Sequence, residues 1–184
     1  MSLTPSNMMP LGTKAPDFKL QDTVTLDNYA LNDIKGEKGT LVMFICNHCP
    51  FVKHVNEEIV RISNDYRVHG FGIVAISSND ADNYPEDAPS EMHKNAQKHN
   101  FTFPYLYDES QKVAKSYDAA CTPDFYLFDS ELKLVYRGQL DNSRPGNGIL
   151  VNGRDLREAF DNILNNHPQR KDQKPSIGCN IKWK

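Results

Sequence analysis

An apolar run that leads directly into a helical pattern is the feature that most constrains this sequence. Residues 40–45 form a continuous apolar run after a glycine, as expected of a buried central strand. Between Phe51 and Tyr66, apolar residues recur every three or four positions, which predicts one face of a helix that ends near Gly70. Residues 71–76 predict a second buried strand. This order predicts two parallel strands joined by a right-handed crossover.

The rest of the chain adds elements on both sides of this unit. Two short alternating segments, 17–20 and 24–26, predict an N-terminal hairpin. Further on, we expect a helix ending near residue 99, a short strand at 105–107, a helical turn within 109–117, strands at 125–128 and 134–140, and a helix around 156–164. The plan matches the thioredoxin fold, an α/β fold with a central mixed sheet flanked by helices. We expect one such domain over residues 1–167, with an extension at 1–38 and a docked tail at 168–184.

Charge and hydropathy narrow the function classes. The 184 residues carry a formal net charge of -3 and have a pI of about 6.1, which gives no reason to expect nucleic acid or an anionic membrane as a partner. No apolar run approaches the ~18–20 residues needed to span a bilayer. Residues 1–13 lack a basic region followed by an apolar stretch, so we expect a cytoplasmic protein.

The junction between the predicted strand and helix is a Cys-x-x-Cys motif, Cys46-Asn47-His48-Cys49. A helix N-terminus presents unpaired N–H groups and a partial positive charge, and both favour the thiolate, which is the nucleophile. The spacing lets Cys49 reach Cys46 on the first helical turn, so we expect the pair to form a reversible disulfide. As the first cysteine at the helix N-terminus, Cys46 is expected to be the more exposed thiol with the lower pKa. His48 is expected to add a hydrogen bond or positive charge near the thiolate of Cys46.

Two other interpretations of the motif stay open. A Cys-x-x-Cys pair is also half of many zinc sites, although the other two cysteines, Cys121 and Cys179, do not form a second such pair. The motif is also compatible with two buried thiols that act as small hydrophobic side chains. A zinc-binding or chaperone-like module without catalysis is therefore the alternative from a different class.

Three stretches outside the motif carry a resemblance. They are Gly12-Thr13-Lys14-Ala15-Pro16-Asp17-Phe18-Lys19-Leu20, Phe103-Pro104-Tyr105-Leu106-Tyr107-Asp108 and Thr122-Pro123-Asp124-Phe125-Tyr126-Leu127-Phe128-Asp129. Over about residues 10–165, the chain resembles the thioredoxin-like superfamily that includes the alkyl-hydroperoxide-reductase/thiol-specific-antioxidant and TlpA-type proteins. The segment from Cys46 to His54 more closely resembles a peroxiredoxin-like subfamily of uncharacterised proteins.

The resemblance implies a redox role for Cys46 and a cis Thr122–Pro123 bond that faces the reactive cysteines. This sequence also differs from those of peroxiredoxins at two positions. Their peroxidatic cysteine corresponds to Cys49, preceded by a proline seven residues earlier and a threonine or serine three residues earlier, where this chain has Val42 and Cys46. The missing hydroxyl argues against fast peroxidase chemistry.

The leading hypothesis is a thiol–disulfide oxidoreductase in which Cys46 attacks and Cys49 resolves the mixed disulfide. His48 tunes the thiolate, and Pro123 shapes the docking surface. Partners are protein or small-molecule thiols and disulfides, and no metal or organic cofactor is implied. A peroxiredoxin-like antioxidant thiol peroxidase that uses Cys46 is the second enzymatic hypothesis.

Three residues outside the motif need separate interpretation. Cys121 directly precedes Thr122-Pro123, so it is either a further thiol near the pair or a buried small residue. Cys179 lies in a tail with apolar residues, where it is either a resolving thiol or a packed one. Arg137, in a predicted strand, is expected at the surface.

Overall fold

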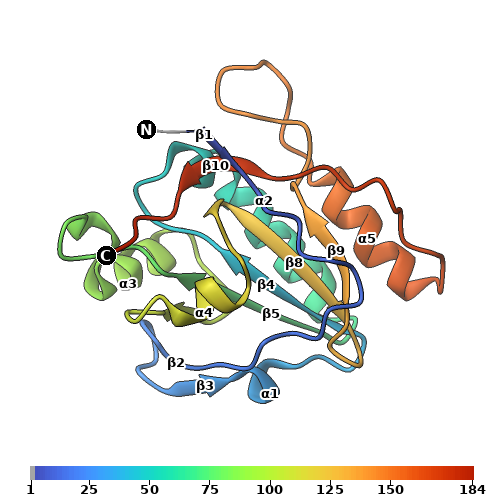
Figure 1. Ribbon diagram of the computed structural model, residues 1–184, viewed down its shortest axis with the longest axis horizontal. Coiled ribbons are helices and arrows are strands. Elements are labelled where there is room, and N and C mark those ends of the chain that lie inside the picture. The colour runs from blue at the N-terminus through green and yellow to red at the C-terminus, as the bar shows by residue number, and fades with distance from the viewer. Residues whose placement is uncertain (1–2) are drawn as a thin grey trace.

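Seven strands form the central sheet of this computed structural model, which describes residues 3–184 (Figure 1). Their order across the sheet is β3-β2-β6-β5-β4-β8-β9. Strand β5 runs parallel to both β4 and β6, whereas β8 is antiparallel to β4 and to β9. The strands are β2 (Lys19–Asp22), β3 (Asn28–Ala30), β4 (Gly39–Phe44), β5 (Phe71–Ser77), β6 (Tyr105–Tyr107), β8 (Asp124–Asp129) and β9 (Leu134–Gly138).

Helices cover both faces of this sheet. They are α1 (Leu31–Ile34), α2 (Pro50–Arg67), α3 (Pro89–Lys98), α4 (Lys112–Ser116) and α5 (Arg154–Leu164), with a short 3-10 helix, η1 (Pro85–Asp87). Helices α2, α3 and α5 share a core with Leu41 and Met43, whereas α1 and α4 share the opposite core with Val42 and Phe44. Strand β4 is therefore buried on both faces, which explains its uninterrupted apolar sequence.

A second, smaller sheet brings the two ends of the chain together. Its order is β1 (Leu3–Pro5), β10 (Ile177–Asn180) and β7 (Cys121–Thr122), with both pairings antiparallel. In Figure 1, the C-terminal segment passes from α5 across the molecule to β10, which lies beside β1. This sheet contains Cys121, Thr122 and Cys179, so the tail reaches the region of the predicted reactive centre.

The predicted mixed sheet flanked by helices is confirmed, and one boundary of the N-terminal hairpin is corrected. Strands β2 and β3 pair antiparallel, but residues 24–26 form the turn rather than the second strand. The Asp22 carboxylate accepts a hydrogen bond from the Thr25 N–H at 2.9 Å, and Leu26 has a φ of 66°. The side chain of Asp22 thus stabilises a turn in a sequence that alternates like a strand.

Candidate active site

The Cys-x-x-Cys motif lies in the connection between β4 and α2. After β4, the Ile45 N–H donates to the Ile76 carbonyl at 3.0 Å, so the chain stays in the sheet up to Cys46. Helix α2 then begins at Pro50, with Cys49 as its N-cap residue. Proline is well suited to the first helical position because its missing N–H would have no partner there. The helix therefore starts at the second cysteine rather than at the first.

Cys49 Sγ is surrounded by hydrogen-bond donors. A hydrogen bond from the Cys46 thiol is the largest influence and lowers the pKa of Cys49, while burial opposes it. The thiol and N–H of Cys179 and the N–H of Val52 add to the lowering, and the pKa of Cys49 falls to about 5. Cys49 Sγ also lies 3.3 Å from the Thr122 carbonyl oxygen, to which only the protonated thiol can donate. The donors outweigh this contact, so Cys49 is a thiolate at neutral pH.

Cys46 is the protonated partner of the pair. Its hydrogen bond to Cys49, its burial and the negative charge of Asp87 all raise its pKa, against a lowering contact with the Thr122 hydroxyl. The expectation that Cys46 has the lower pKa is therefore wrong. Neither thiol is exposed, so exposure does not distinguish them. Cys46 is 1% exposed and Cys49 is 0% exposed. The main reason for the reversal is that the Cys46 thiol donates its hydrogen bond to Cys49, and the thiol of Cys179 and the N–H groups of Val52 and Cys179 add to the lowering of the Cys49 pKa.

The loop before β8 faces the cysteine pair. The Thr122–Pro123 peptide bond is cis, as the resemblance implied. Thr122 Oγ1 lies 3.3 Å from Cys46 Sγ. The loop thus brings a hydroxyl to one sulfur of the pair and a carbonyl to the other, and residues separated by more than 70 positions in the sequence meet at the site.

His48 lies at the centre of a polar network that does not include a direct bond to Cys46. Its Nδ1 atom lies 2.6 Å from an Asp87 carboxylate oxygen, and this hydrogen bond raises the pKa of His48. Burial raises the pKa of Asp87, but hydrogen bonds from His48 and Asn79 outweigh it and lower the value. The Asn47 N–H donates to the same carboxylate at 2.7 Å. The His48 ring also stacks on Tyr84, with centroids 5.5 Å apart.

Asp87 is the functional residue that the sequence analysis missed. It ends the short helix η1, which follows β5, and its carboxylate accepts hydrogen bonds from the N–H groups of both residues between the cysteines. It also holds His48 and raises the pKa of Cys46. The sequence offered one signal, an acidic residue between two prolines in the loop after β5, but nothing in that pattern points to Cys46.

Cys46, His48 and Asp87 are also the residues that could hold a metal ion. One donor atom of each lies within 4.8 Å of the others. The His48 and Asp87 atoms already hydrogen-bond each other at 2.6 Å, so a metal would have to replace that bond. This cluster gives the zinc hypothesis a specific location and a specific test.

The two remaining cysteines lie differently with respect to the pair. Cys179 Sγ is 2.8 Å from Cys49 Sγ, so the tail thiol is part of the site. Cys121 is buried, and its sulfur contacts the Pro123 carbonyl oxygen at 3.9 Å. Within the part of the chain that the structure describes, Cys121 makes no hydrogen bond to Cys46 or Cys49.

Arg137 is buried at 0% exposure, so its predicted surface position is wrong. Its guanidinium lies over the ring of Tyr126, 4.8 Å from the ring centroid, and its Nη2 atom lies 3.4 Å from the carboxylate of Asp124. Strand alternation places this arginine inward, beneath the loop that carries Thr122 and Pro123. The buried acid and ring of its neighbours are what hold its charge in the interior.

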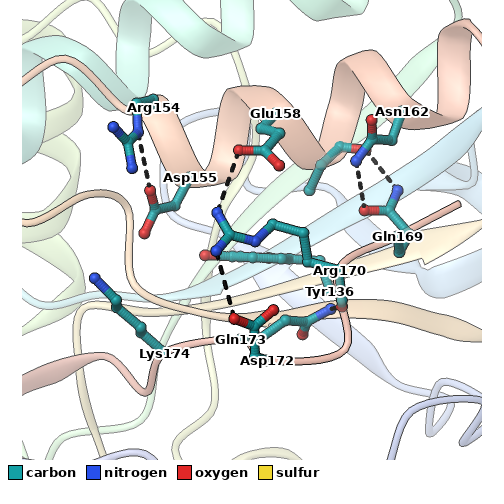
Figure 2. A pocket seen from close by; sticks show the side chains of 11 residues that line it. Tyr136, Arg154, Asp155, Glu158, Asn162, Gln169, Arg170, Asp172, Gln173 and Lys174 are labelled. Carbon is teal, nitrogen blue, oxygen red and sulfur yellow. Dashed lines mark hydrogen bonds and ion pairs between the residues drawn. The ribbon is translucent and has the colours of Figure 1, made fainter. Parts of the chain in front are cut away.

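A separate pocket lies between α5, β9 and the C-terminal segment (Figure 2). Polar and charged side chains line it, and none of its lining residues is a cysteine. Arg170 reaches Glu158 at 3.6 Å and Asp172 at 3.5 Å across this pocket. Its contacts hold the segment that leads to β10 against α5, and it is not part of the thiol site.

These elements define a thioredoxin-fold protein with a thiol pair at the N-terminus of α2. The sequence profile of the AhpC/TSA family matches residues 11–137, and the chain belongs to this family. Family and site together place it among the thiol-based redox proteins. A comparison with curated proteins finds no match. No helix within residues 3–184 has the length and apolar character needed to cross a membrane.

Solved structures show how widely the fold is shared. An uncharacterized conserved protein from Geobacillus kaustophilus is 58% identical, with a TM-score of 0.98 over 100% of this chain and 97% of that chain. A hypothetical protein from Sinorhizobium meliloti 1021 is 47% identical, with a TM-score of 0.96 over 98% of both chains. The thioredoxin domain of a thiol-disulfide oxidoreductase from Bacteroides vulgatus is 22% identical, with a TM-score of 0.60 over 71% of this chain and 89% of that chain. The last similarity concerns the fold alone.

Proposed function

We propose that this protein is a thiol–disulfide oxidoreductase that uses Cys46 and Cys49 as its redox pair. The observation that carries the proposal is the charge asymmetry of two hydrogen-bonded thiols. The pKa of Cys49 is about 5, whereas the pKa of Cys46 is raised. At neutral pH such a pair holds one nucleophilic thiolate and one proton.

In the proposed reaction, the Cys49 thiolate attacks one sulfur of a substrate disulfide. A bond forms between Cys49 Sγ and that sulfur, the substrate S–S bond breaks, and the other substrate sulfur leaves and takes up a proton. Cys46 then loses its proton and attacks Cys49 Sγ, which closes the Cys46–Cys49 disulfide and releases the second substrate thiol. Two electrons pass to the substrate. These roles reverse those expected from the sequence.

The substrate class is a protein or small-molecule disulfide, and the reverse reaction oxidises dithiols. The loop with Thr122 and Pro123 faces the pair, but β10 covers it, and both sulfurs are buried. The proposal therefore requires that β10 move before a partner sulfur reaches Cys49. Asp87 holds the motif backbone in place by accepting hydrogen bonds from the Asn47 and His48 N–H groups.

Oxidised glutathione tests the assignment of the attacking sulfur. We expect Cys46→Ser, combined with Cys179→Ser to remove the other sulfur near Cys49, to accumulate a glutathione adduct on Cys49. Cys49→Ser should not form an adduct on Cys46 at a comparable rate. Cys121→Ser is the matched control and should behave as the native protein does. The native protein should form a Cys46–Cys49 disulfide and retain no glutathione.

Two results would overturn this function. One is that both thiols of the native protein stay reduced in oxidised glutathione. The other is stoichiometric zinc in protein purified without chelator, together with loss of that zinc in Cys46→Ser and His48→Ala. The second result would establish the metal site formed by Cys46, His48 and Asp87 instead.

A thiol peroxidase is the second candidate, and one observation favours it. In peroxiredoxins, as the resemblance implies, a hydroxyl three residues before the peroxidatic cysteine belongs to the site. Here Cys46 stands at that position, and its thiol hydrogen-bonds Cys49 in place of the hydroxyl. Reduction of hydrogen peroxide coupled to formation of a Cys46–Cys49 disulfide would favour this candidate over the first.

A further inference from the structure

Strand β10 places a third sulfur against the redox pair. Cys179 pairs with Thr122 in the antiparallel ladder between β10 and β7. The Sγ atoms of Cys179 and Cys49 lie 2.8 Å apart, which is only about 0.8 Å longer than a disulfide bond of ~2.05 Å. Cys49 also accepts a hydrogen bond from the Cys46 thiol. Cys49 is thus the central sulfur of three.

The chain on both sides of Cys179 is held in place. Before β10, the Gln139 N–H donates to the Lys174 carbonyl at 3.0 Å, and Ser176 Oγ donates to the Pro123 carbonyl at 2.5 Å. After β10, the Lys182 N–H donates to the side-chain oxygen of Asn79 at 2.8 Å. The proximity of Cys179 to Cys49 is therefore built into the fold and does not depend on a loose tail.

The charge state of Cys49 controls the reactivity of Cys179. Burial, together with a hydrogen bond to the Cys49 thiolate and its negative charge, raises the pKa of Cys179 to about 12. When Cys49 joins a disulfide, its negative charge disappears, and so do two of these causes. Burial, which is the largest cause of the raised pKa, remains, and so does the positive charge of Lys182, which lowers the pKa of Cys179. Oxidation of the pair therefore makes Cys179 a better nucleophile next to the sulfur that it would attack.

We propose that Cys179 is a third redox thiol of this centre. In the oxidised protein, it replaces Cys46 as the disulfide partner of Cys49. The inference rests on the proposed function of the Cys46–Cys49 pair. The Cys179 sulfur, once deprotonated, attacks Cys49 Sγ. The Cys49–Cys179 bond forms, the Cys46–Cys49 bond breaks, and Cys46 takes up the proton that Cys179 lost. The exchange is redox-neutral and needs no external oxidant or reductant.

The exchange has a structural consequence. In the Cys46–Cys49 form, β10 is held by hydrogen bonds and side-chain packing and is able to move aside for a partner. In the Cys49–Cys179 form, β10 is covalently tied to the N-terminus of α2, and Cys46 is a thiol again. The oxidised protein thus has two forms. The Cys46–Cys49 form can transfer its disulfide to a partner, whereas the Cys49–Cys179 form keeps its disulfide covered by β10.

Cys121 provides a matched control within the same ladder. It is adjacent to Thr122, pairs with Asn180 and is buried like Cys179. Because side chains alternate along a strand, Cys121 faces away from the side on which Thr122 meets the pair. If any buried thiol of β7 or β10 could form a disulfide with the pair, Cys121 would do so as well. The proposed exchange involves Cys179 and not Cys121.

The test is disulfide mapping after oxidation with one molar equivalent of diamide, followed by acid quenching and alkylation. We expect the native protein and Cys121→Ser to contain both the Cys46–Cys49 and the Cys49–Cys179 linkages, in a ratio that does not depend on protein concentration. Cys179→Ser should retain only the first linkage. Cys46→Ser should form only the second, with complete loss of the first.

The outcomes separate this inference from the proposed function. A native protein with only the Cys46–Cys49 linkage, together with a Cys46→Ser variant whose Cys49 and Cys179 stay reduced, would overturn the third thiol and leave the proposed function intact. A Cys49–Cys179 linkage without any Cys46–Cys49 linkage, in the native protein and in Cys121→Ser, would overturn both the exchange and the proposed pair.

Discussion

At the scale of single residues, the two cysteines of the motif differ because Cys46 donates a hydrogen bond that Cys49 accepts, and because their other neighbours differ. Cys49 caps α2 and accepts hydrogen bonds from the N–H groups of Val52 and Cys179. Cys46 lies three residues earlier in the sequence, and the negative charge of Asp87 raises its pKa. The hydrogen bond from the Cys46 thiol is the largest cause of the low pKa of Cys49, so the contact between the two side chains contributes most to the choice of the nucleophile.

Removing the Cys46 thiol should raise the pKa of Cys49. A hydrogen bond to a charged group contributes roughly 1.5–3 kcal/mol, which corresponds to about 1–2 pH units. In the native protein, alkylation of Cys49 by iodoacetamide should have its midpoint near pH 5, and in Cys46→Ala the midpoint should move upward by that amount. Cys121→Ser should leave it unchanged. A midpoint that stays near 5 in Cys46→Ala would show that the main-chain donors alone set the pKa.

Oxidation of the reduced protein by hydrogen peroxide should be much slower than in dedicated peroxiredoxins. Cys49 is a thiolate, but it is 0% exposed, and Val42 and Cys46 stand where peroxiredoxins carry proline and a hydroxyl residue. Stopped-flow fluorescence of the reduced protein measures the rate. A rate typical of peroxiredoxins, lost in Cys49→Ser and kept in Cys121→Ser, would instead make the peroxidase the main function.

His48 should titrate above its ordinary range because of Asp87. The hydrogen bond to Asp87 raises the pKa of His48, whereas burial lowers the pKa of His99. The NMR titration midpoint of His48 should fall in Asp87→Asn, and that of His99 should not change. The protonated imidazole stabilises the fold fully below about pH 6.5, and this contribution is lost as pH rises through the folded-state value. An unchanged midpoint of His48 would contradict the ion pair.

The residues of the site differ in how far the sequence could reveal them. The spacing of the motif identified Cys46 and Cys49, and the resemblance alone implied the cis Thr122–Pro123 bond. Asp87 could not be found, since it reaches the motif only after the chain has passed through α2 and β5 and returned 40 positions later. The predicted pKa order was wrong for a related reason, because the pattern could not show that Cys179, 130 positions away, and the Cys46 thiol would both donate hydrogen bonds to Cys49.

At the scale of elements, long apolar patterns were predictable and short strands were not. Strand β4 and helix α2 match their predicted ranges closely, because a run of six residues and a helix of 18 carry strong periodic signals. Strands β1, β7 and β10 have only three, two and four residues. They form by pairing between segments that are far apart in the sequence, so no local sequence pattern predicts them.

Strand β10 should be displaced by adding one methyl group at Gly178. A Cβ there would overlap the carbonyl oxygen of Thr122 and lie 3.3 Å from the Pro123 ring. Overpacking of this kind is destabilising by about 1–3 kcal/mol. If this destabilisation lowers the free energy needed to move β10 away from Cys49 by the same amount, alkylation of Cys49 should become about 5- to 150-fold faster in Gly178→Ala.

The control for this variant is Gly146→Ala, whose added Cβ would meet no atom within 4 Å. Its alkylation rate should match that of the native protein. Equal rates in Gly178→Ala and the native protein would mean that β10 does not limit access to Cys49. Circular dichroism of both variants establishes whether the rest of the fold is retained.

At the scale of the whole molecule, the two ends of the chain are joined above a buried acid. Ser6 donates to Asp124 at 2.6 Å, and Ser176 hydrogen-bonds both to Ser6 and to the Pro123 carbonyl. Asp124 directly follows the cis bond, and Arg137 lies beneath it. The small sheet, the loop facing the cysteines and the central sheet thus meet at Asp124. Its charge state is expected to affect stability more than that of any exposed acid.

Folding stability should depend on the protonation of Asp124 in an unusual direction. Burial raises the pKa of Asp124 to about 6, against the charge of Arg137 and the hydrogen bond from Ser6, whereas an unfolded aspartate titrates near 3.9. Between these values the folded state holds a proton that the unfolded state has released. The free energy of unfolding should therefore decrease as pH rises from about 4 to about 6, by at most about 3 kcal/mol from this group.

The comparison with Asp124→Asn isolates this contribution from those of the other acids. Urea unfolding of both proteins between pH 4 and pH 8 gives the difference in their free energies of unfolding at each pH. We expect the native protein to gain relative to Asp124→Asn as pH falls through about 6, since the asparagine cannot take up a proton. If the native protein instead gains as pH rises, the positive charge of Arg137 outweighs burial, and Asp124 is ionised throughout this range.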